Sequence, residues 1–174
     1  MSSPRARPPN AAQAHEAGAA PSRAETSGVS FPPPLLYVAG FLVGVGLELA
    51  FPVGRPPLAV TLAGVVIGAV GWLLLDGAAT RLFARAKTNM APFKPSTALV
   101  TDGPYRFTRN PMYVGMAFLY AALAFAIGLL WPLAVLPLVL LAVDRLVIAR
   151  EEPYLERTFG EDYRVYRARV RRWL

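Results

Sequence analysis

Apolar residues along this chain fall into four long runs, and each run is typical of a helix. The runs cover about residues 35–53, 58–80, 112–130 and 132–149. At about 1.5 Å per residue, each can cross the roughly 30 Å of hydrocarbon in a bilayer, although the fourth is short for this. The alternative is that the runs are buried helices of a soluble protein. Four long runs with almost no charge make this alternative unfavourable. The pattern therefore predicts an all-α membrane protein with about four transmembrane helices.

Positive charge is distributed unevenly between these runs. Arg55 is the only charged residue between the first two runs, and the short segment LLWP joins the third to the fourth. Lys and Arg concentrate instead in the long loop at about residues 81–111 and in the segment after the fourth run. Because positively charged loops stay in the cytoplasm, we expect this loop and both termini there, with the chain in a bacterial inner membrane.

Composition narrows the choice of partner and chemistry. Hydrophobic residues make up 55% of the chain and charged residues 17%, which favours a protein that resides in the bilayer. A net charge of +7 suits nucleic acid or anionic lipid, and the apolar runs decide for lipid and against nucleic acid. The chain has no Cys, and its single His15 lies near the N-terminus, so we expect no thiol chemistry and no metal site.

The N-terminal region differs from the rest of the chain. Residues 1–30 are rich in Ala, Pro, Ser and Gly and contain no apolar run, which predicts a disordered tail and no secretory signal. Residues 31–174 are then expected to form one membrane domain.

Charged residues within the apolar runs each need a partner, since an isolated charge in hydrocarbon is costly. We expect Glu48 to meet Arg55 at the membrane interface and Asp76 to pair with an arginine of the long loop. Glycine pairs at the spacing G-x-x-x-G occur in both of the first two runs, at 40–44 and 64–68. This spacing predicts close packing of the first two helices.

The fourth run carries charge into the segment that follows it. At the spacing of an α-helix, Asp144 shares a face with Glu151, and Arg145 shares a face with Glu152. We interpret this track as a polar pocket at the cytoplasmic interface, with a purely structural ion-pair network as the alternative.

The last residues, EDYRVYRARVRRWL, predict a basic amphipathic helix. Tyr163, Tyr166, Val170 and Trp173 fall on one stripe at helical spacing. The arginines that point away from this stripe are Arg164, Arg171 and Arg172. Such a helix lies on an anionic membrane surface or folds over the cytoplasmic face of the domain.

The segment TDGPYRFTRNPMYVG, residues 101–115, places a basic loop immediately before the third run. Asn110 is a good N-cap and Pro111 suits the first helical position, so a helix is expected to start abruptly here. A helix start presents N–H groups and partial positive charge, which Arg106 and Arg109 strengthen. We therefore expect an anion-binding rim at the edge of the bilayer.

Two acidic residues are expected opposite this rim. Glu151 and Glu152 follow the fourth run, and a tight hairpin between the third and fourth helices brings them back to the rim. Cationic groups on one side and carboxylates on the other would suit a zwitterionic ligand. Helix caps and topology signals alone would also account for these residues, and the pattern by itself leaves both interpretations open.

These residues occur in the order and spacing of a known family. The segments LVTDGPYRFTRNPMYVG and REEPYLERTFGEDYRVYRARV resemble the isoprenylcysteine carboxyl methyltransferase family and the related phospholipid methyltransferases. The resemblance covers about residues 94–173. Its elements are Gly-x-Tyr at 103–105, Arg-x-Pro-x-Tyr at 109–113, the Glu pair at 151–152, Phe-Gly at 159–160 and Tyr-x-x-Tyr at 163–166.

The resemblance implies a small integral membrane enzyme that uses S-adenosyl-L-methionine. The residues that it implies for the cofactor pocket are Tyr105, Arg109, Asn110, Pro111, Tyr113, Glu151 and Glu152. Of these, it implies catalytic roles for Arg109 and Glu152. The acceptor would be a lipid-like or prenylated small molecule, methylated on a carboxyl, amine or thiol group at the cytoplasmic face of the membrane.

One position departs from the family, and two other functions compete with methyl transfer. Asn110 stands where the eukaryotic prenylcysteine enzymes have His, and because Asn does not titrate near neutral pH, the prenylcysteine substrate does not follow. A reductase resembling the NADPH-dependent membrane steroid reductases is one alternative, disfavoured because Met116 follows Gly115 where those enzymes have Glu. A non-enzymatic four-helix scaffold is the other. The sequence leaves the oligomeric state open.

Overall fold

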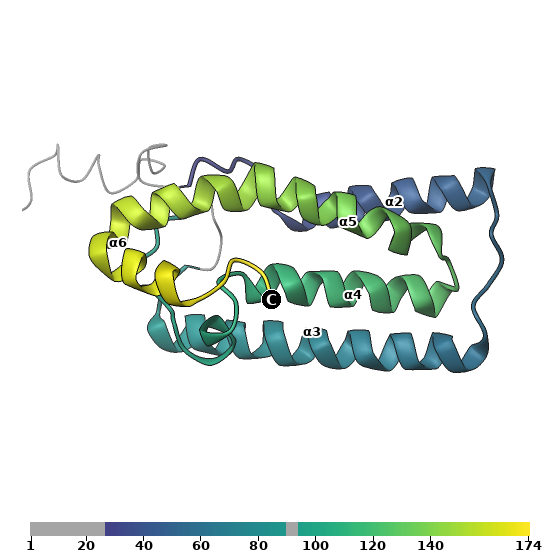
Figure 1. Ribbon diagram of the computed structural model, residues 1–174, viewed down its shortest axis with the longest axis horizontal. Coiled ribbons are helices and arrows are strands. Elements are labelled where there is room, and N and C mark those ends of the chain that lie inside the picture. Colours follow the sequence, from purple (N-terminus) through teal and green to yellow (C-terminus); the bar gives the residue numbers. More distant parts are fainter. Residues whose placement is uncertain (1–26, 90–93) are drawn as a thin grey trace, which may run out of the picture.

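Long apolar helices run side by side and form the body of the protein (Figure 1). The computed structural model describes residues 27–89 and 94–174. The long helices are α2 (Pro34–Ala50), α3 (Leu58–Ala86), α4 (Pro111–Ile127), α5 (Trp131–Val143) and α6 (Ala149–Arg169). The short 3-10 helix η1 (Gly103–Arg106) precedes α4, and the π-helical turn η2 (Asp144–Ile148) joins α5 to α6. No strand occurs within the described ranges, so the predicted all-α class is confirmed for them.

Proline and glycine fix the ends of these helices. Pro34 and Pro111 each stand at the first position of a helix, where a missing N–H costs no hydrogen bond. Gly128 ends α4 with a φ of +76°, a left-handed conformation that glycine adopts without strain. Helix α3 reaches Ala86, beyond the expected end near residue 80. The turn between α4 and α5 is short, as the hairpin prediction requires.

Two helical segments are long and apolar enough to cross a membrane, α3 and the continuous α5–η2–α6 segment. Helices α2 and α4 are apolar but have 17 residues each, so their length alone does not establish four spans. Large apolar side chains on the outer faces of α2 and α3 are exposed, Leu42 by 63%, Ile67 by 63% and Leu74 by 67%. A soluble monomer rarely exposes so much apolar surface. These features indicate a membrane protein.

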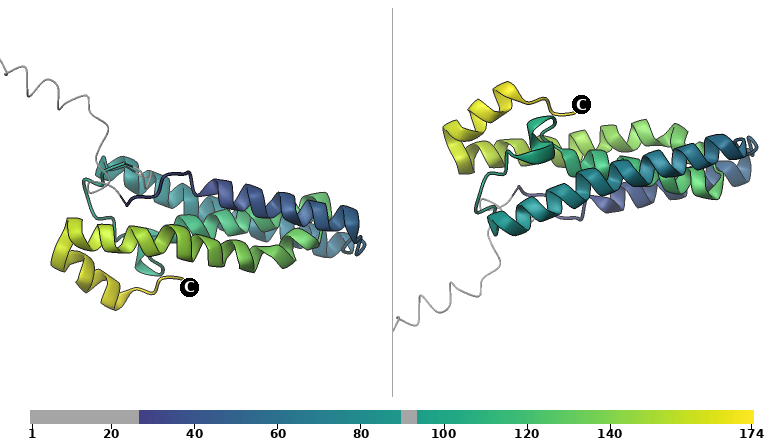
Figure 2. Two further views of the ribbon diagram at one scale, coloured as in Figure 1. Left: turned by 90° about the horizontal axis from the view of Figure 1, so that it is seen from above. Right: turned by 90° about the horizontal axis from the view of Figure 1, so that it is seen from below.

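The first two helices pack against the later ones and not against each other. Helix α2 lies along α5, and α3 lies along α4 (Figure 2). Gly44 faces the backbone of Pro132, and Gly68 faces the backbone of Phe118, so closely that a Cβ at either glycine would overlap its neighbour. The predicted contact between the first two helices was therefore wrong. The two glycine pairs do allow close approach, but each pair serves a different partner helix.

Two predicted ion pairs do not form among the described residues. Glu48 accepts hydrogen bonds from the backbone N–H groups of Val53 (3.1 Å) and Trp131 (3.5 Å) and makes no ion pair with Arg55. These amides belong to the turns at the same end of the bundle and lie closer than the arginine. Asp76 has no ion pair either, because Arg81 and Arg85 lie on the part of α3 that continues beyond it, and Arg109 of the loop binds Glu152 instead.

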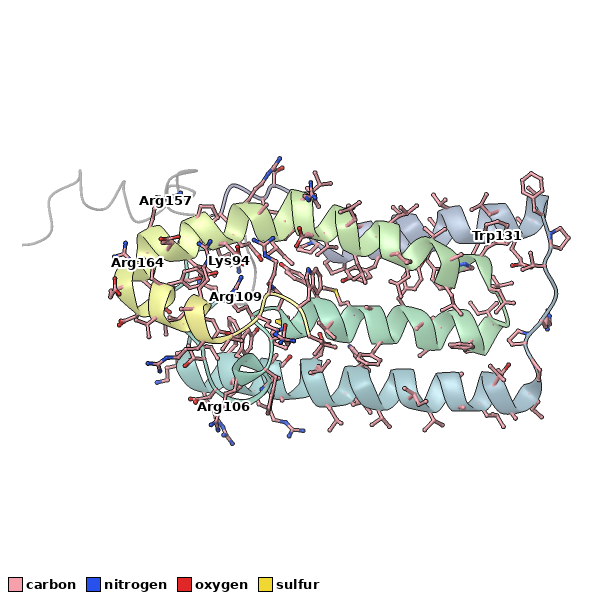
Figure 3. The ribbon with its side chains drawn as sticks, in the orientation of Figure 1. Lys94, Arg106, Arg109, Trp131, Arg157 and Arg164 are labelled. Carbon is pink, nitrogen blue, oxygen red and sulfur yellow. The ribbon has the colours of Figure 1, made fainter. Side chains whose placement is uncertain are left out.

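Helix α6 changes direction and returns over the end of the bundle. Gly160 adopts φ +55° and ψ −123°, which interrupts α6 and turns its second half back toward η1 (Figure 2). The labelled cations Lys94, Arg106, Arg157 and Arg164 lie at this end of the molecule, whereas Trp131 lies at the other (Figure 3). The loop before α4, the start of α6 and the C-terminus therefore meet at one end.

The segment before α2 also reaches this end. Val29 is 2% exposed and packs with Tyr37, Tyr113 and Val147 in the core between the helices. The predicted tail over residues 1–30 thus has its last residues against the bundle, and its remainder, residues 1–26, lies outside the described ranges.

Candidate functional site

The loop before α4 is held against the last residues of the chain, which we call the C-terminal strap (residues 170–174). Helix α6 ends at Arg169, and Val170 is extended, with φ −117° and ψ 134°. Thr108 forms an isolated parallel bridge with Arg171, and its hydroxyl donates to the carbonyl of Arg172 at 3.0 Å. The strap therefore lies beside the loop as an added extended segment.

Asn110 occupies the expected position at the start of α4, but its side chain does not cap the helix. Its backbone carbonyl accepts from the N–H groups of Tyr113 and Val114. Its side-chain Nδ2 donates to the carbonyl of Arg172 at 2.9 Å. The predicted side-chain cap was therefore wrong, because the strap competes for the amide group.

Arg109 joins the loop, the strap and α6 through one guanidinium group. Its Nη1 donates to the carbonyls of Val170 (2.7 Å) and Arg167 (3.0 Å), and its Nη2 donates to Glu152 Oε1 (2.7 Å). Its Nε is buried and has no hydrogen-bond partner among the described residues. One N–H of this guanidinium group is therefore left unsatisfied.

Glu152 is 6% exposed and binds two arginines. Besides Arg109, it accepts from Arg172 Nη2 at 2.5 Å and from Arg172 Nε at 3.1 Å. Burial alone would raise the pKa of Glu152, but the hydrogen bonds and charges of Arg172 and Arg109 outweigh it and hold the pKa below its ordinary value. Both carboxylate oxygens therefore accept hydrogen bonds from arginines, and Glu152 stays ionised.

Arg172 also reaches Asp144, which corrects two expectations. It binds Asp144 Oδ1 at 3.2 Å, and Trp173 Nε1 donates to the same oxygen at 3.1 Å. Arg172 and Trp173 were assigned to opposite faces of a helix, but α6 ends before them. The π turn rotates the chain less per residue than an α-helix does, so Asp144 and Glu152 lie on the same side and both bind Arg172. The predicted face that joined Asp144 to Glu151 was therefore wrong. Arg145 points outward, 73% exposed.

Glu151 differs from its neighbour in having no cation. Its Oε1 accepts a hydrogen bond from the hydroxyl of Tyr113 at 2.8 Å. Burial is the largest influence on the pKa of Glu151 and raises it, the bond from Tyr113 lowers it, and the charge of Glu152 raises it; the net pKa is about 7. Adjacent glutamates thus have opposite tendencies, one ionised and one near its midpoint at neutral pH.

The second half of α6 closes the site from outside the bundle. Tyr163 is 1% exposed, and the hydroxyl of Tyr166 donates to the backbone carbonyl of Tyr105 at 2.8 Å. Both tyrosine rings pack with Tyr105 and Ala79, as the aromatic stripe predicted. The helix therefore folds over this end of the domain.

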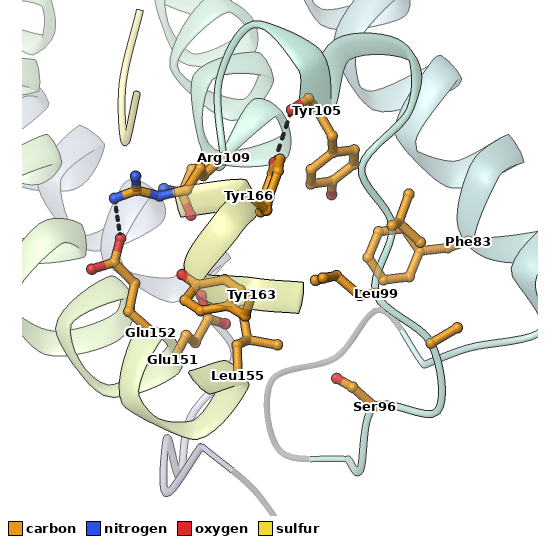
Figure 4. Close-up of a pocket in the computed structure, with 13 residues that line it drawn as sticks. Phe83, Ser96, Leu99, Tyr105, Arg109, Glu151, Glu152, Leu155, Tyr163 and Tyr166 are labelled. Carbon is orange, nitrogen blue, oxygen red and sulfur yellow. Dashed lines mark hydrogen bonds and ion pairs between the residues drawn. The ribbon is translucent and has the colours of Figure 1, made fainter. Parts of the chain in front are cut away.

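Two adjoining cavities lie within this arrangement. The smaller, about 70 Å³, is bounded by Glu152, Tyr163 and Tyr166 on one side and by Leu99 and Phe83 on the other (Figure 4). The larger, about 450 Å³, extends into the bundle. The residues that line both are Phe83, Ser96, Tyr105, Arg109, Asn110, Glu151 and Leu155.

The larger cavity has a polar side and an apolar side. Its polar groups include Arg109, Glu151 and Asp76, and its apolar wall includes Met112 and Met116 of α4. Pro32–Pro34, before and at the start of α2, complete the wall. Its volume falls within the range of about 300–1,000 Å³ that is usual for small-molecule sites.

Most of the residues predicted for the site come together around these cavities. Those that line the larger cavity are Tyr105, Arg109, Asn110, Tyr113 and Glu151. Glu152 borders the smaller one. Pro111 borders neither and is fully buried at the start of α4. Arg106 is exposed and lies outside the cavity walls.

Sequence reasoning missed the strap and part of the apolar wall. Arg172 was read as a surface charge, because nothing in a helical pattern indicates that the helix stops three residues earlier. Tyr154, whose hydroxyl accepts from the N–H of Ser96 at 2.8 Å, and Met112 also line the cavity without having been predicted. The spacing of Met112 and Met116 on one face of α4 was the available signal.

Comparison with known proteins identifies the family of this chain. An uncharacterized protein of Haemophilus influenzae is 54% identical over 35 residues, which cover 20% of this chain and 56% of that protein. The chain thus matches about half the length of this curated relative. No solved structure matches. The family described as phospholipid methyltransferase matches residues 58–162, more than half of the 174 residues. The chain therefore belongs to the phospholipid methyltransferase family, a family of membrane methyltransferases.

Proposed function

We propose that this protein is an S-adenosyl-L-methionine-dependent methyltransferase that acts on a lipophilic acceptor at the cytoplasmic face of the membrane. The observation that carries the proposal is the larger cavity, in which motif residues from the loop before α4 and from α6 face apolar side chains of the bundle. A charged donor and an apolar acceptor need a site with one polar side and one apolar side. Membership of the phospholipid methyltransferase family supports the same reaction class.

The polar side of the cavity fits a zwitterion. The guanidinium group of Arg109, whose Nε–H has no partner, suits the carboxylate of the methionyl group, and the carboxylate of Glu151 suits its ammonium or a ribose hydroxyl. The ring of Tyr105 offers an aromatic wall between them. When bound, S-adenosyl-L-methionine supplies an electrophilic methyl group on a positively charged sulfur. The residues of this chain position the two substrates and exclude water.

Arg109 and Glu152 have different roles in this proposal. Arg109 lines the cavity and has one N–H without a partner, so it is the residue that would contact the ligand. Glu152 has both oxygens on arginines, so it acts as a positioning residue that fixes Arg109. The structural ion-pair network and the polar pocket, which the sequence offered as alternatives, are therefore parts of one arrangement.

The proposal includes a placement in the membrane. Helices α2 and α4, together with α3 and α5, would form four spans in a bacterial inner membrane. The basic end, with both termini, would face the cytoplasm, where the concentration of Lys and Arg supports this orientation. The donor would then arrive from water, and a lipid-like or prenylated acceptor would arrive laterally from the bilayer through the apolar wall.

The direct test is binding of S-adenosyl-L-methionine to the purified protein in detergent, measured by calorimetry. We expect the wild type to bind. The affinity of Glu151→Gln should be lower by a factor of up to about ten, because a charge-assisted hydrogen bond is lost. Glu156→Gln, on the outer side of α6, is the matched control and should bind as the wild type does. Absence of binding to the wild type would overturn the proposal.

The same samples separate the rival functions. A titration with NADPH should give no heat if the chain is a methyltransferase, whereas NADPH binding in place of S-adenosyl-L-methionine would favour a reductase. A non-enzymatic scaffold would bind neither molecule and would tolerate Glu151→Gln without any change in ligand response.

A further inference from the structure

Three arginines stand along the outer face of the continuous helical segment α5–η2–α6 (Figure 1). Arg145 lies in the π turn η2, and Arg150 and Arg157 lie in α6. All three are exposed, and none of them lines either cavity. We call these three residues the arginine row. The row is therefore a surface feature that the proposed methyl transfer does not use.

The π turn brings the first two arginines of the row onto one face. In a regular α-helix, residues five apart point about 140° apart, because each residue turns the helix by roughly 100°. In η2 the N–H of Ala149 donates to the carbonyl of Asp144, so residues five apart lie about one turn apart. Arg150 and Arg157 are seven residues apart, which is about two α-helical turns. The arginine row therefore forms one line along the segment.

The described residues compensate little of the positive charge of the row. Arg150 and Arg157 form no ion pair within residues 27–89 and 94–174. Arg145 approaches Asp144 at 3.7 Å, but Asp144 accepts shorter hydrogen bonds from Arg172 and Trp173. An anionic partner from outside this part of the chain would therefore meet cations that are still available.

The row continues a stripe of exposed apolar side chains on α5. Leu138 and Leu141 lie about two turns and one turn before Arg145, and both are exposed. They belong to a segment that is long and apolar enough to span a membrane, where they would contact acyl chains. An arginine that follows such a stripe directs its guanidinium group to the headgroup layer. This face thus changes from apolar to cationic in the same order as a phospholipid changes from acyl chain to phosphate.

We infer that the arginine row binds the phosphate group of an anionic phospholipid, whose acyl chains lie against Leu138 and Leu141. Guanidinium groups donate paired hydrogen bonds to phosphate oxygens, which a lysine ammonium does not. Three cations with little compensation favour a headgroup of net negative charge, because the ammonium of a zwitterionic headgroup is repelled by them. This lipid binds outside the cavities, so it is a partner of the protein and not the molecule that is methylated.

The test measures thermal unfolding of the full chain in neutral maltoside micelles. The micelles contain dioleoylphosphatidylglycerol or dioleoylphosphatidylcholine at the same mole fraction. We expect the anionic lipid to raise the Tm of the wild type by about 3–5 °C more than the zwitterionic lipid does. The triple variant Arg145→Gln, Arg150→Gln and Arg157→Gln should lose most of this difference, because each arginine contributes to the attraction.

A second triple variant, Arg81→Gln, Arg85→Gln and Arg106→Gln, is the control matched in charge. These arginines are exposed on α3 and η1 and form no ion pair within the described ranges. The control should keep the difference between the two lipids. Equal losses in the two triple variants would show a diffuse attraction to the whole basic end and would overturn the inference.

Two further measurements identify what the row binds. Glycerol phosphate, which has the charged group without acyl chains, should leave the Tm of the wild type nearly unchanged. If it stabilised the protein as much as the anionic lipid, the row would be a site for soluble phosphates and the inference would be wrong. Equal stabilisation of the wild type by the two lipids would also refute it.

Stability in micelles without added lipid separates binding from folding. The triple variant of the row should unfold within about 1 °C of the wild type, because substitutions at exposed positions change stability little. A large loss of Tm would reveal partners of the row within the protein and contradict the inference. These measurements use neither methyl donor nor acceptor, so their outcome is independent of the proposed function.

Discussion

The two ends of the helix bundle satisfy their polar groups in different ways. At the end that holds the two short turns, Glu48 binds the backbone N–H groups of Val53 and Trp131, and Trp131 Nε1 donates to the carbonyl of Phe51 at 2.7 Å. These bonds fix the turns to the starts and ends of helices. They complete the local structure at this end of the bundle.

At the site end, side chains from separate parts of the chain bind one another. Arg109, Glu152 and Arg172 connect the loop before α4, helix α6 and the strap. The two buried side-chain atoms that lack a partner within the described ranges, Asp76 Oδ2 and Arg109 Nε, both belong to residues that line the cavity at this end. Among the described residues, the buried polar atoms that lack a hydrogen-bond partner therefore lie at the end of the bundle where we propose that a ligand binds.

The largest expected effect comes from removing the acid at the centre of the site end. Glu152→Ala leaves the Arg109 side chain, which is only 11% exposed, without its ion pair, and we expect a loss of about 3–5 kcal/mol in the free energy of unfolding. Thermal and denaturant unfolding in detergent measure it. Glu156→Ala breaks an exposed pair with Arg167 and should cost about 1 kcal/mol or less. Equal losses would show that buried pairs do not hold this end.

The next effect concerns the apolar part of the bundle. Gly44→Ala places a methyl group against the backbone of Pro132, and overpacking of this kind costs about 1–3 kcal/mol. Gly46→Ala, two residues away, meets open space and should be neutral or stabilising by about 0.5–1 kcal/mol. The stabilities of the two variants are compared by unfolding under the same conditions. Equal stabilities would contradict the packing of α2 on α5.

Glu151 predicts a pH dependence of stability at the site end. Its folded pKa of about 7 lies above the ordinary value of 4.5, so the folded state holds the proton more tightly. Stability from this group is therefore greatest at low pH and is lost as the pH rises from about 4.5 through 7. Relative to Glu151→Gln, the Tm of the wild type should fall by roughly 2–6 °C between pH 5 and 8. A constant difference across this range would contradict the assignment.

The smallest effect compares one hydrogen bond at each end. Tyr166→Phe removes a bond to the carbonyl of Tyr105, and Tyr120→Phe removes a bond to the carbonyl of Pro132. Each should cost about 0.5–1.5 kcal/mol of stability. Only Tyr166→Phe should also weaken binding of S-adenosyl-L-methionine, since Tyr105 borders the cavity. Equal effects on binding would remove the functional distinction between the ends.

The sequence was sufficient for the features that depend on local pattern. Apolar runs and proline positions located the helices, with the start of α4 at Pro111 as predicted. The pairing of a basic loop with the Glu151–Glu152 acids also followed, because a tight hairpin must bring these segments together. The observed 2.7 Å contact between Arg109 and Glu152 confirms that they meet at one end of the bundle.

Features that depend on a change of backbone geometry did not follow from the sequence. The π turn at Asp144–Ile148 rotates the later residues relative to an α-helix, so the predicted faces of the acidic track were displaced by one position. The end of α6 at Arg169 converts two expected helix faces into an extended strap. Partner choice between helices was also undetermined, because a glycine pair specifies close approach and not the helix that approaches.

The π turn has a consequence for length variation among relatives. A π turn holds one residue more than the α-helical turn that it replaces, so deleting one residue within Asp144–Ile148 would let the helix become regular while the flanking segments keep their orientation. We expect such a deletion to be tolerated, whereas the same deletion after Ala149 would rotate the acids away from Arg172. Gaps in alignments of this family should therefore be placed at this turn, where chain length can vary without cost to the chemistry.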